Sequence, residues 1–248
     1  MKETRLMLGM PITVNIVDSQ ATQENIDEVF AYFKYIDNKF SVFKKDSEIN
    51  QINRGEIMEN EYSDDMEEIF LLAEKTKKES HGYFDIHHKG KLNPSGVVKG
   101  WAIHQAAKIL EKDGFSNFYV DAGGDIQVKG NNHLGKPWTL GIRNPFNRNE
   151  NIKIVKLINK GIATSGTYIR GQHIYNPFKP QDPIMEIVSL TVIGPNVFEA
   201  DRFATPAFAM GKEGILFIES IQGLEGYMID SNGVATFTKG WNQYVYKD

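Results

Sequence analysis

Residues 161–177, GIATSGTYIRGQHIYNP, gather groups that can do chemistry in a stretch with little apolar periodicity. The stretch holds three glycines, three Ser or Thr hydroxyls, one arginine and one histidine, His173. One interpretation is a serine nucleophile, but the G-x-S-x-G elbow that exposes such a serine is absent. The alternative is a turn rich in glycine and hydroxyl groups that contacts a phosphate or a polar ring.

Two other segments combine glycines with charged residues. In LNPSGVVKGW, residues 92–101, a Ser-Gly pair precedes an expected helix whose first turn holds Lys99. Free N–H groups at a helix start bind anions, and a lysine there adds a point charge for phosphate. A helix cap with a solvated lysine explains the same residues. In DAGGDIQVKG, residues 121–130, paired glycines between acidic residues indicate either close approach of the backbone to a ligand or a tight bend.

The segment EADRFATPAFAMG, residues 199–211, places Asp201 and Thr205 four residues apart. On a helix the two side chains would share one face and offer oxygen ligands to a hard cation such as Mg²⁺. Spacing alone favours another interpretation, in which Thr205 is the N-cap of a helix that begins at Pro206. Residues 130–136 match the start of a phosphate-binding loop, but Pro137 replaces its Ser or Thr and a strand follows, so we expect a surface hairpin.

Length and composition indicate an ordinary globular protein. The chain has 248 residues, 41% of them hydrophobic and 24% charged, and no repeat or linker divides it, so we expect one domain over residues 1–248. A net charge of −4 gives no reason to expect a nucleic-acid partner, and no apolar run reaches the length of a membrane span. Without cysteine there is no disulfide or thiolate metal site. The start of the chain lacks the apolar core of a signal peptide, so a cytoplasmic protein is expected.

Apolar periodicity predicts both helices and strands. Helices are expected after Thr22, after Ser63 and near residue 97, the last ending at Gly114. Further helices are expected over residues 199–211 and 213–221. Strands are expected over residues 11–18, 118–122, 125–130, 138–142, 152–158, 161–166 and 186–194, followed by two or three closing strands at 226–230, 234–238 and 243–247. Their irregular interleaving favours an α+β fold of mixed sheets with flanking helices.

The order of these motifs resembles the ApbE family, the FAD:protein FMN transferases, from about Leu8 to Gly211. The matching segments are FSVFKKDSEINQIN, GYFDI, PSGVVKGWAI, DAGGDIQVKG, IATSGTYIRGQHIYNP and TVIGPNVFEADRFATPAFAMG. The resemblance implies an ApbE-like fold with the flavin in a central cleft. It also implies cleavage of the FAD pyrophosphate with Mg²⁺, release of AMP, and transfer of FMN to a Thr or Ser of an acceptor protein. Two alternatives need the same pocket: an FAD pyrophosphatase that uses water, and a non-catalytic FAD-binding protein.

The resemblance also implies roles for individual residues. Asp201, Thr205 and a backbone carbonyl near Gly96 would bind Mg²⁺. Lys99 would stabilise charge on the phosphates, and His173 would transfer a proton or position the substrate. The expected catalytic residues are therefore His173, Asp201 and Lys99. The expected flavin-binding residues are Phe43, Phe84, Asp85, Asn93, Lys99 and His173. Because Pro206 stands where the family usually has a small helix former, we expect the metal-binding helix to begin later or to kink there.

Overall fold

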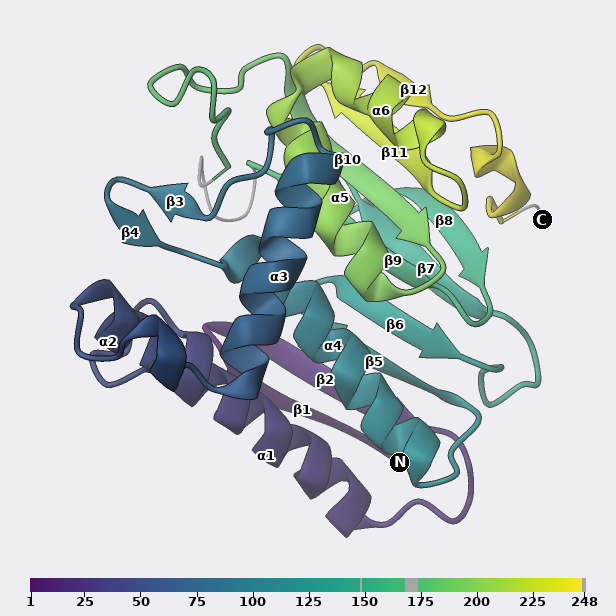
Figure 1. Cartoon of the computed structure of the whole chain (residues 1–248). Helices are drawn as coiled ribbons and strands as arrows, with labels where there is room; N and C mark the ends of the chain where they lie inside the picture. The colour runs from purple at the N-terminus through teal and green to yellow at the C-terminus, as the bar shows by residue number, and fades with distance from the viewer. Residues whose placement is uncertain (148, 168–173, 247–248) are drawn as a thin grey trace.

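An antiparallel sheet of eight strands forms the centre of the computed structural model, which describes residues 1–147, 149–167 and 174–246 (Figure 1). The strand order is β1-β2-β5-β6-β9-β10-β11-β12. The strands are β1 (Lys2–Met7), β2 (Met10–Ile16), β5 (Phe118–Ala122), β6 (Asp125–Lys129), β9 (Gly161–Gly166), β10 (Ile187–Gly194), β11 (Glu225–Asp230) and β12 (Ala235–Phe237). Two hairpins lie outside this sheet: β3 (His87–His88) with β4 (Lys91–Leu92), and β7 (Trp138–Arg143) with β8 (Asn151–Leu157).

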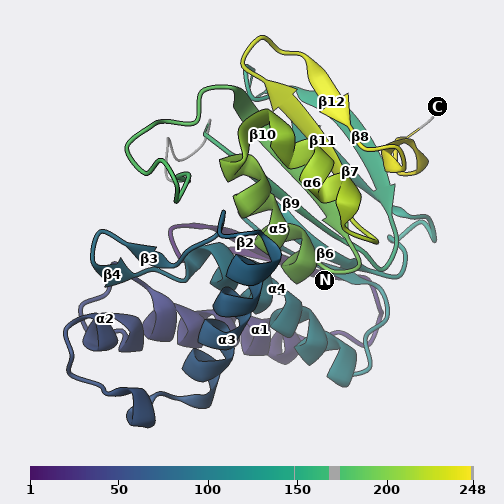
Figure 2. The same ribbon diagram turned by 45° about the horizontal axis from the view of Figure 1, so that its top comes forward.

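The helices gather on one face of the sheet (Figures 1 and 2). They are α1 (Gln23–Phe40), α2 (Glu48–Asn53), α3 (Asp64–Glu79), α4 (Ser95–Lys112), α5 (Val197–Ala209) and α6 (Gly214–Ser220). Helices α4 and α5 pack against each other and against the middle strands, and α3 packs on α4. The β7–β8 hairpin packs on the opposite face, beside strands β6 and β9 to β11. This arrangement confirms the expected α+β class with flanking helices. The expected mixed sheets are not found, because all strand pairs of the described residues are antiparallel.

The predicted helix starts at Thr22 and Ser63 are confirmed. Thr22 begins α1 in a capping box with Asn25, whose Oδ1 accepts from the Thr22 backbone N–H at 3.0 Å. Ser63 begins α3, and its hydroxyl oxygen accepts from the Met66 N–H at 3.4 Å. Acidic side chains in the first turn of α3 complement the positive end of its helix dipole.

Helix α5 begins earlier than a Thr205 cap would require. Its N-cap is Asn196, whose side chain accepts from the Glu199 N–H at 2.9 Å, and the helix continues through Pro206 to Ala209. Thr205 as a helix cap is therefore wrong, and so is the expectation of a helix that begins later. The reason is that an Asn cap ten residues upstream of Pro206 starts the helix, which then accommodates the proline without ending. Asp201 and Thr205 consequently lie on one face of one helix.

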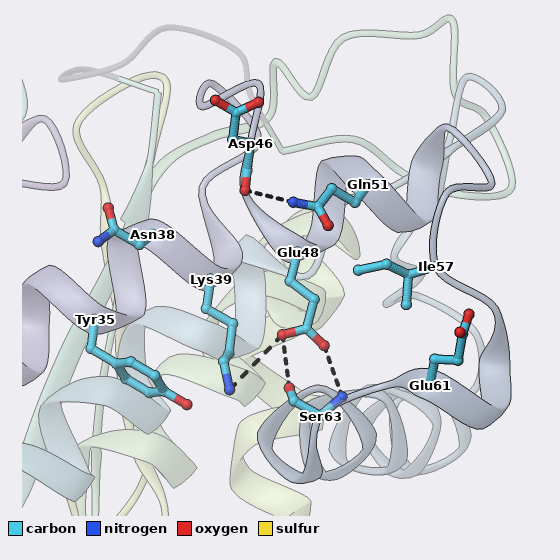
Figure 3. A pocket seen from close by; sticks show the side chains of 9 residues that line it. All are labelled: Tyr35, Asn38, Lys39, Asp46, Glu48, Gln51, Ile57, Glu61 and Ser63. Atoms are coloured by element: carbon cyan, nitrogen blue, oxygen red, sulfur yellow. Dashed lines mark hydrogen bonds and ion pairs between the residues drawn. The ribbon is translucent and has the colours of Figure 1, made fainter.

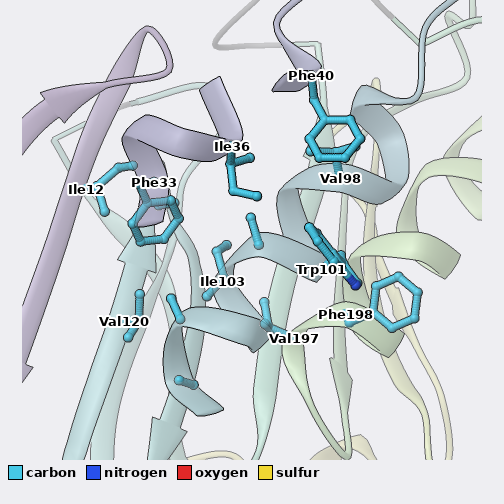
Figure 4. Close-up of a cluster of buried hydrophobic side chains, with 14 of the residues drawn as sticks. Ile12, Phe33, Ile36, Phe40, Val98, Trp101, Ile103, Val120, Val197 and Phe198 are labelled. Atoms are coloured by element: carbon cyan, nitrogen blue, oxygen red, sulfur yellow. The ribbon is translucent and has the colours of Figure 1, made fainter. Parts of the chain in front are cut away.

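The largest core cluster fills the space between the sheet and helices α1, α3 and α4 (Figure 4). Ile12 and Val120 extend from β2 and β5 toward Phe33 of α1 and Ile103 of α4, all almost completely buried. Burial of each such side chain contributes about 1.5–3 kcal/mol. A second cluster lies between α5, α6 and strands β9 to β11. These two cores fix the positions of α4 and α5, the two helices that carry the candidate site.

The end of the chain differs from expectation. Residues 243–246, the described part of the strand expected over 243–247, form no strand: a 3-10 turn at Trp241–Gln243 precedes a single bridge from Val245 to Val155 of β8. The fully buried Trp241 draws the chain into the core on the hairpin face, so the segment cannot extend the large sheet. Residues 130–136 form a surface connection between β6 and β7, in which Asn132 Oδ1 accepts from the Leu134 N–H at 2.9 Å. The segment is thus a surface loop followed by a strand, not a phosphate-binding loop. The predicted hairpin is wrong, because β6 pairs with β5 and β9, whereas β7 pairs with β8 in a separate sheet. Along the described ranges no helix combines the length and apolarity needed to span a membrane.

Candidate functional site

Four segments that are far apart in the sequence meet where α4 and α5 reach the sheet. The ammonium of Lys99, in the first turns of α4, forms an ion pair with the carboxylate of Asp125 at the start of β6. The same ammonium lies 3.4 Å from Asp201 Oδ1 of α5. Asp125 Oδ1 also accepts from the backbone N–H of Thr164 in β9 at 3.0 Å. Lys99 is therefore not a solvated cap lysine. Its ammonium connects α4 directly to Asp125 of β6 and to Asp201 of α5, and Asp125 connects it to Thr164 of β9.

Two glycines allow α4 and α5 to approach each other this closely. A Cβ at Gly100 would stand 2.6 Å from the Cβ of Asp201, and the Gly100 N–H donates to Asp201 Oδ2 at 2.8 Å. One turn earlier, a Cβ at Gly96 would stand 2.8 Å from the ring of Phe84 and 3.6 Å from Thr205 Cγ2. Any larger residue at either position would separate the helices or displace the site side chains.

The group is buried and carries excess negative charge. Asp125 and Asp201 are 2% and 3% exposed, whereas the Lys99 side chain keeps partial access to solvent. Burial raises the pKa of Asp201 to about 7; the Asp125 charge acts in the same direction, while the Lys99 charge and the Gly100 N–H oppose it. Among the described residues two carboxylates share one ammonium, so their charges favour the binding of a second cation.

The chemistry of the nearby oxygen donors fits Mg²⁺. Asp201 and Thr205 stand one turn apart on α5, and a Cβ at Gly96 would contact the methyl group of Thr205, so a carboxylate, a hydroxyl group and the backbone of Gly96 belong to neighbouring residues. The Thr205 hydroxyl makes no hydrogen bond with another residue of the described chain. No group of three or more His, Asp or Glu side chains suited to a metal occurs among the described residues. A Mg²⁺ ion here would take few protein ligands and complete its shell with phosphate oxygens and water, which is its usual mode in phosphate-processing sites.

Two of the residues expected to bind flavin lie at the start of α4. Phe84 is 4% exposed and packs beside Gly96. Asn93 Oδ1 accepts from both the backbone N–H and the hydroxyl of Ser95, at 3.1 and 2.6 Å. The structure therefore brings Phe84 and Asn93 to the helix end that holds Gly96 and Lys99, and Asn93 orders the first turn of that helix.

Phe43 is presented differently, on the turn between α1 and α2, where its side chain is 95% exposed. Asn50 orders this turn, because its Nδ2 donates to the carbonyls of Val42 and Lys44, both at 2.9 Å. Asn53 of the same helix joins α2 to β4 through a pair of hydrogen bonds with the Leu92 backbone, at 2.8 and 3.0 Å. A large aromatic side chain is thus displayed to solvent from an ordered turn that is connected to the strand leading into α4.

Asp85 has its carboxylate engaged within the protein. It accepts from Lys77 Nζ and from the His87 N–H, both at 2.8 Å, and contacts His87 Nδ1 at 3.1 Å. Burial by itself would raise the pKa of Asp85, but these partners lower it below its ordinary value. Its backbone carbonyl accepts from the Tyr175 hydroxyl at 2.7 Å. Contact between the Asp85 carboxylate and a flavin, as the family resemblance implies, would therefore have to compete with these partners.

His173 lies outside the described residues, in the undescribed range 168–173, so its expected role stays a prediction. Asp125, by contrast, belongs to the site, although its motif by itself predicts only a tight bend or a close approach of the backbone to a ligand. The bend exists: Gly123 and Gly124 have φ of 66° and 101°, and the Gly124 N–H donates to Asp121 Oδ1 at 2.8 Å. The acidic residue directly after a glycine turn was the available signal, but its partner Lys99 is 26 positions away along the chain.

Two surface cavities lie elsewhere and share no lining residue with the Lys99 group. One, of about 460 Å³, lies between α1, α2 and the start of α3 (Figure 3). Its floor is already paired: Glu48 accepts from the Ser63 hydroxyl at 2.8 Å and from the Ser63 N–H at 2.9 Å, and Lys39 lies 3.9 Å from Glu48. The other, of about 420 Å³, lies between α1, α3 and α4. Neither cavity contains the residues expected to bind flavin.

Comparison with known proteins places the chain in a family. The model of the ApbE family matches residues 8–90 and 86–228. The chain belongs to the ApbE family.

Curated relatives are called FAD:protein FMN transferases. Those of Klebsiella pneumoniae (strain 342) and Escherichia coli (strain K12) are each 34% identical to this chain over 148 residues, 56% of this chain and 42% of the relative. These alignments thus span less than half of either relative. The relative from Haemophilus influenzae is 25% identical over 95% of this chain and 90% of its own length.

Solved structures of similar proteins confirm the ApbE-like fold. The flavin transferase ApbE from Vibrio cholerae superposes with a TM-score of 0.85 at 19% identity, covering 98% of each chain. The ApbE protein from Thermotoga maritima gives a TM-score of 0.85 at 20% identity, covering 100% of this chain and 99% of that one.

Proposed function

We propose that this chain is a Mg²⁺-dependent FAD:protein FMN transferase, which attaches FMN through a phosphoester to a Thr or Ser of an acceptor protein and releases AMP. The observation that carries the proposal is the convergence of Lys99 and Asp201, with Thr205 one turn further on, at a close contact of two helices. The activity named for the curated relatives supports the same conclusion.

In the proposed reaction the acceptor hydroxyl oxygen attacks the phosphorus of the FMN half of FAD. A new P–O bond forms, the pyrophosphate bond to the AMP half breaks, and the hydroxyl proton is released. When bound, Mg²⁺ would supply neutralisation of the pyrophosphate and of the leaving phosphate. Asp201, Thr205 and the Gly96 carbonyl would hold it, because together they offer hard oxygen donors.

The chain's own residues perform the remaining tasks. Lys99, whose side chain is partly exposed, places its ammonium beside the first turns of α4, where it would contact phosphate oxygens whose charge increases as the bond breaks. The ion pair with Asp125 keeps that ammonium in place. His173 is proposed to accept the proton of the acceptor hydroxyl or to position the substrate.

The flavin ring is proposed to lie in a central cleft between the Phe43 turn and the start of α4. Phe43 would stack on the ring, because an exposed aromatic side chain on an ordered turn can contact a planar ring at little cost in conformational entropy. Phe84, Asp85 and Asn93 would form the other side. The protein partner would then reach the pyrophosphate from the open side near Lys99.

The test is to mix the pure chain with FAD and separate the products, with and without Mg²⁺ and with and without a threonine-bearing acceptor domain. The proposal predicts AMP together with an acceptor that has gained the mass of FMN, both only when Mg²⁺ is present. Magnesium-dependent AMP and free FMN, independent of acceptor, would instead establish a pyrophosphatase. Unchanged FAD that stays bound to the chain would establish a binding protein.

A further inference from the structure

We propose that Lys99 and Asp125 together set the affinity of Asp201 for a divalent cation. Lys99 is the internal counter-ion of Asp201 when no metal is bound, and Asp125 is a positioning residue that retains the Lys99 ammonium when a metal takes its place at Asp201. This inference rests on the metal site of the proposed function.

The orientation of the Asp201 carboxylate supports a shared oxygen. Its Oδ2 accepts from the Gly100 N–H at 2.8 Å, and its Oδ1 faces Lys99 Nζ at 3.4 Å. The Gly100 contact involves the backbone of α4 and fixes the carboxylate on one side. Oδ1 is therefore the oxygen for which lysine and metal compete.

The position of Asp125 supports its role as the second partner of the lysine. Of the two carboxylates, Asp125 lies closer to Lys99 Nζ. The contact between Lys99 Nζ and Asp201 Oδ1 is the longer one, at 3.4 Å. Its other oxygen accepts from the Thr164 N–H at 3.0 Å, which fixes the carboxylate to the neighbouring strand. The ammonium can therefore give up Asp201 and stay paired, without movement of either helix.

The charge balance makes both residues necessary. Two nearly fully buried carboxylates repel each other and need a cation beside them, which Lys99 supplies in the absence of metal. If Asp125 were neutral, the ion pair with Asp201 would be left of the two that Lys99 forms with these carboxylates. A metal that binds Asp201 would then have to break this ion pair completely. If Lys99 were neutral, Asp201 Oδ1 would lose the cation that the described residues place beside it, and with it the competitor of the metal.

The experiment measures binding of Mn²⁺ alone to the full chain by electron paramagnetic resonance, which detects free Mn²⁺ and needs no flavin. The variants are Asp125→Asn, Lys99→Met and the double variant. We expect Asp125→Asn to weaken Mn²⁺ binding about 10-fold and Lys99→Met to tighten it, because charges at this separation interact strongly in a buried site. In the Lys99→Met background, Asp125→Asn should weaken Mn²⁺ binding by a clearly smaller factor, because the competing ion pair no longer exists and only the direct attraction between the Asp125 charge and the metal is lost.

Equal fold-changes for Asp125→Asn in both backgrounds would overturn the proposal, since they would mean that the two residues act independently. Weaker Mn²⁺ binding by Lys99→Met would also overturn it. Lys108→Met, on the exposed part of the same helix, controls for loss of a lysine. Asp125→Glu keeps a carboxylate beside Lys99 and should therefore bind Mn²⁺ with nearly the affinity of the wild type. Mn²⁺ binding that Asp201→Asn leaves unchanged would refute the metal site itself, whereas a missing transferase activity with the expected affinities would refute only the proposed reaction.

Discussion

The backbone N–H of Gly100 in α4 donates to the carboxylate of Asp201 in α5 at 2.8 Å, across a helix contact that has no room for a side chain. This hydrogen bond connects the segment that contains Lys99 and Gly100 to the segment that contains Asp201. It explains physically why a glycine follows Lys99. It also fixes the carboxylate that is proposed to bind the metal.

Gly100→Ala should destabilise the protein and disturb the site, because the new Cβ would stand 2.6 Å from the Cβ of Asp201. Overpacking of this kind costs roughly 1–3 kcal/mol in the free energy of unfolding. Each kcal/mol corresponds to about 2–4 °C in Tm for a chain of this size. Thermal unfolding of the variant beside Lys108→Ala, on the exposed part of α4, measures the effect. A Tm equal to that of the control would contradict the close contact.

Asp201→Asn should reduce transferase activity by about 100-fold or more while FAD binding survives, because the amide keeps an oxygen for the Gly100 N–H but loses the charge that binds the metal. AMP release and FAD affinity are the two measurements. The matched control is Asp230→Asn, since Asp230 accepts backbone hydrogen bonds in β11 away from the site. Nearly full activity of Asp201→Asn would remove this residue from the metal site.

Stability and metal binding should depend on pH through Asp201. Its pKa is raised to about 7, whereas the unfolded chain releases this proton near pH 4. Between these values the folded state binds more protons than the unfolded state, so this group lowers the free energy of unfolding as the pH rises. Wild type should therefore lose stability relative to Asp201→Asn from about pH 4 to 7. Over the same range Mg²⁺ binding should tighten and then level off. A constant stability difference between the two proteins would exclude the raised pKa.

Phe43→Ala should weaken FAD binding by roughly 3- to 10-fold, the value of one aromatic contact. Tm should stay unchanged, because the side chain is 95% exposed and contributes little to the core. Asn50→Ala should weaken FAD binding as well, through loss of the hydrogen bonds that order the turn. Leu134→Ala, another exposed apolar side chain, serves as the control. Equal FAD affinities for all of these proteins would place the flavin elsewhere.

Local signals in the sequence predicted much of the fold. The caps at Thr22 and Ser63 are confirmed because a cap depends on residues three positions away. Helix α5 shows the limit of local reasoning: Thr205 followed by Pro206 has the pattern of a helix start, but Asn196 caps the helix first. The sequence of residues 243–247 alternates like a strand, yet burial of Trp241 places residues 243–246 on the hairpin face instead of at the edge of the large sheet.

The sequence indicated most of the individual site residues, but it did not indicate which of them contact one another. Family resemblance indicated Lys99, Asp201, Thr205 and Gly96, and the structure brings them to one helix contact. The ion pair between Lys99 and Asp125 was missed because sheet order and helix packing, not sequence spacing, determine which distant residues meet. The order of the Phe43 turn likewise depends on contacts that sequence spacing does not reveal, the hydrogen bonds from Asn50 Nδ2 to the carbonyls of Val42 and Lys44.

The central claim is that Asp201, Thr205 and the Gly96 carbonyl hold the metal next to the FAD pyrophosphate. Anomalous diffraction from crystals soaked with Mn²⁺ and FAD tests it most directly. The account predicts a Mn²⁺ peak within coordination distance of these three oxygens, with phosphate oxygens of FAD completing the shell. A Mn²⁺ peak elsewhere, or FAD phosphates bound away from α4 and α5, would contradict it.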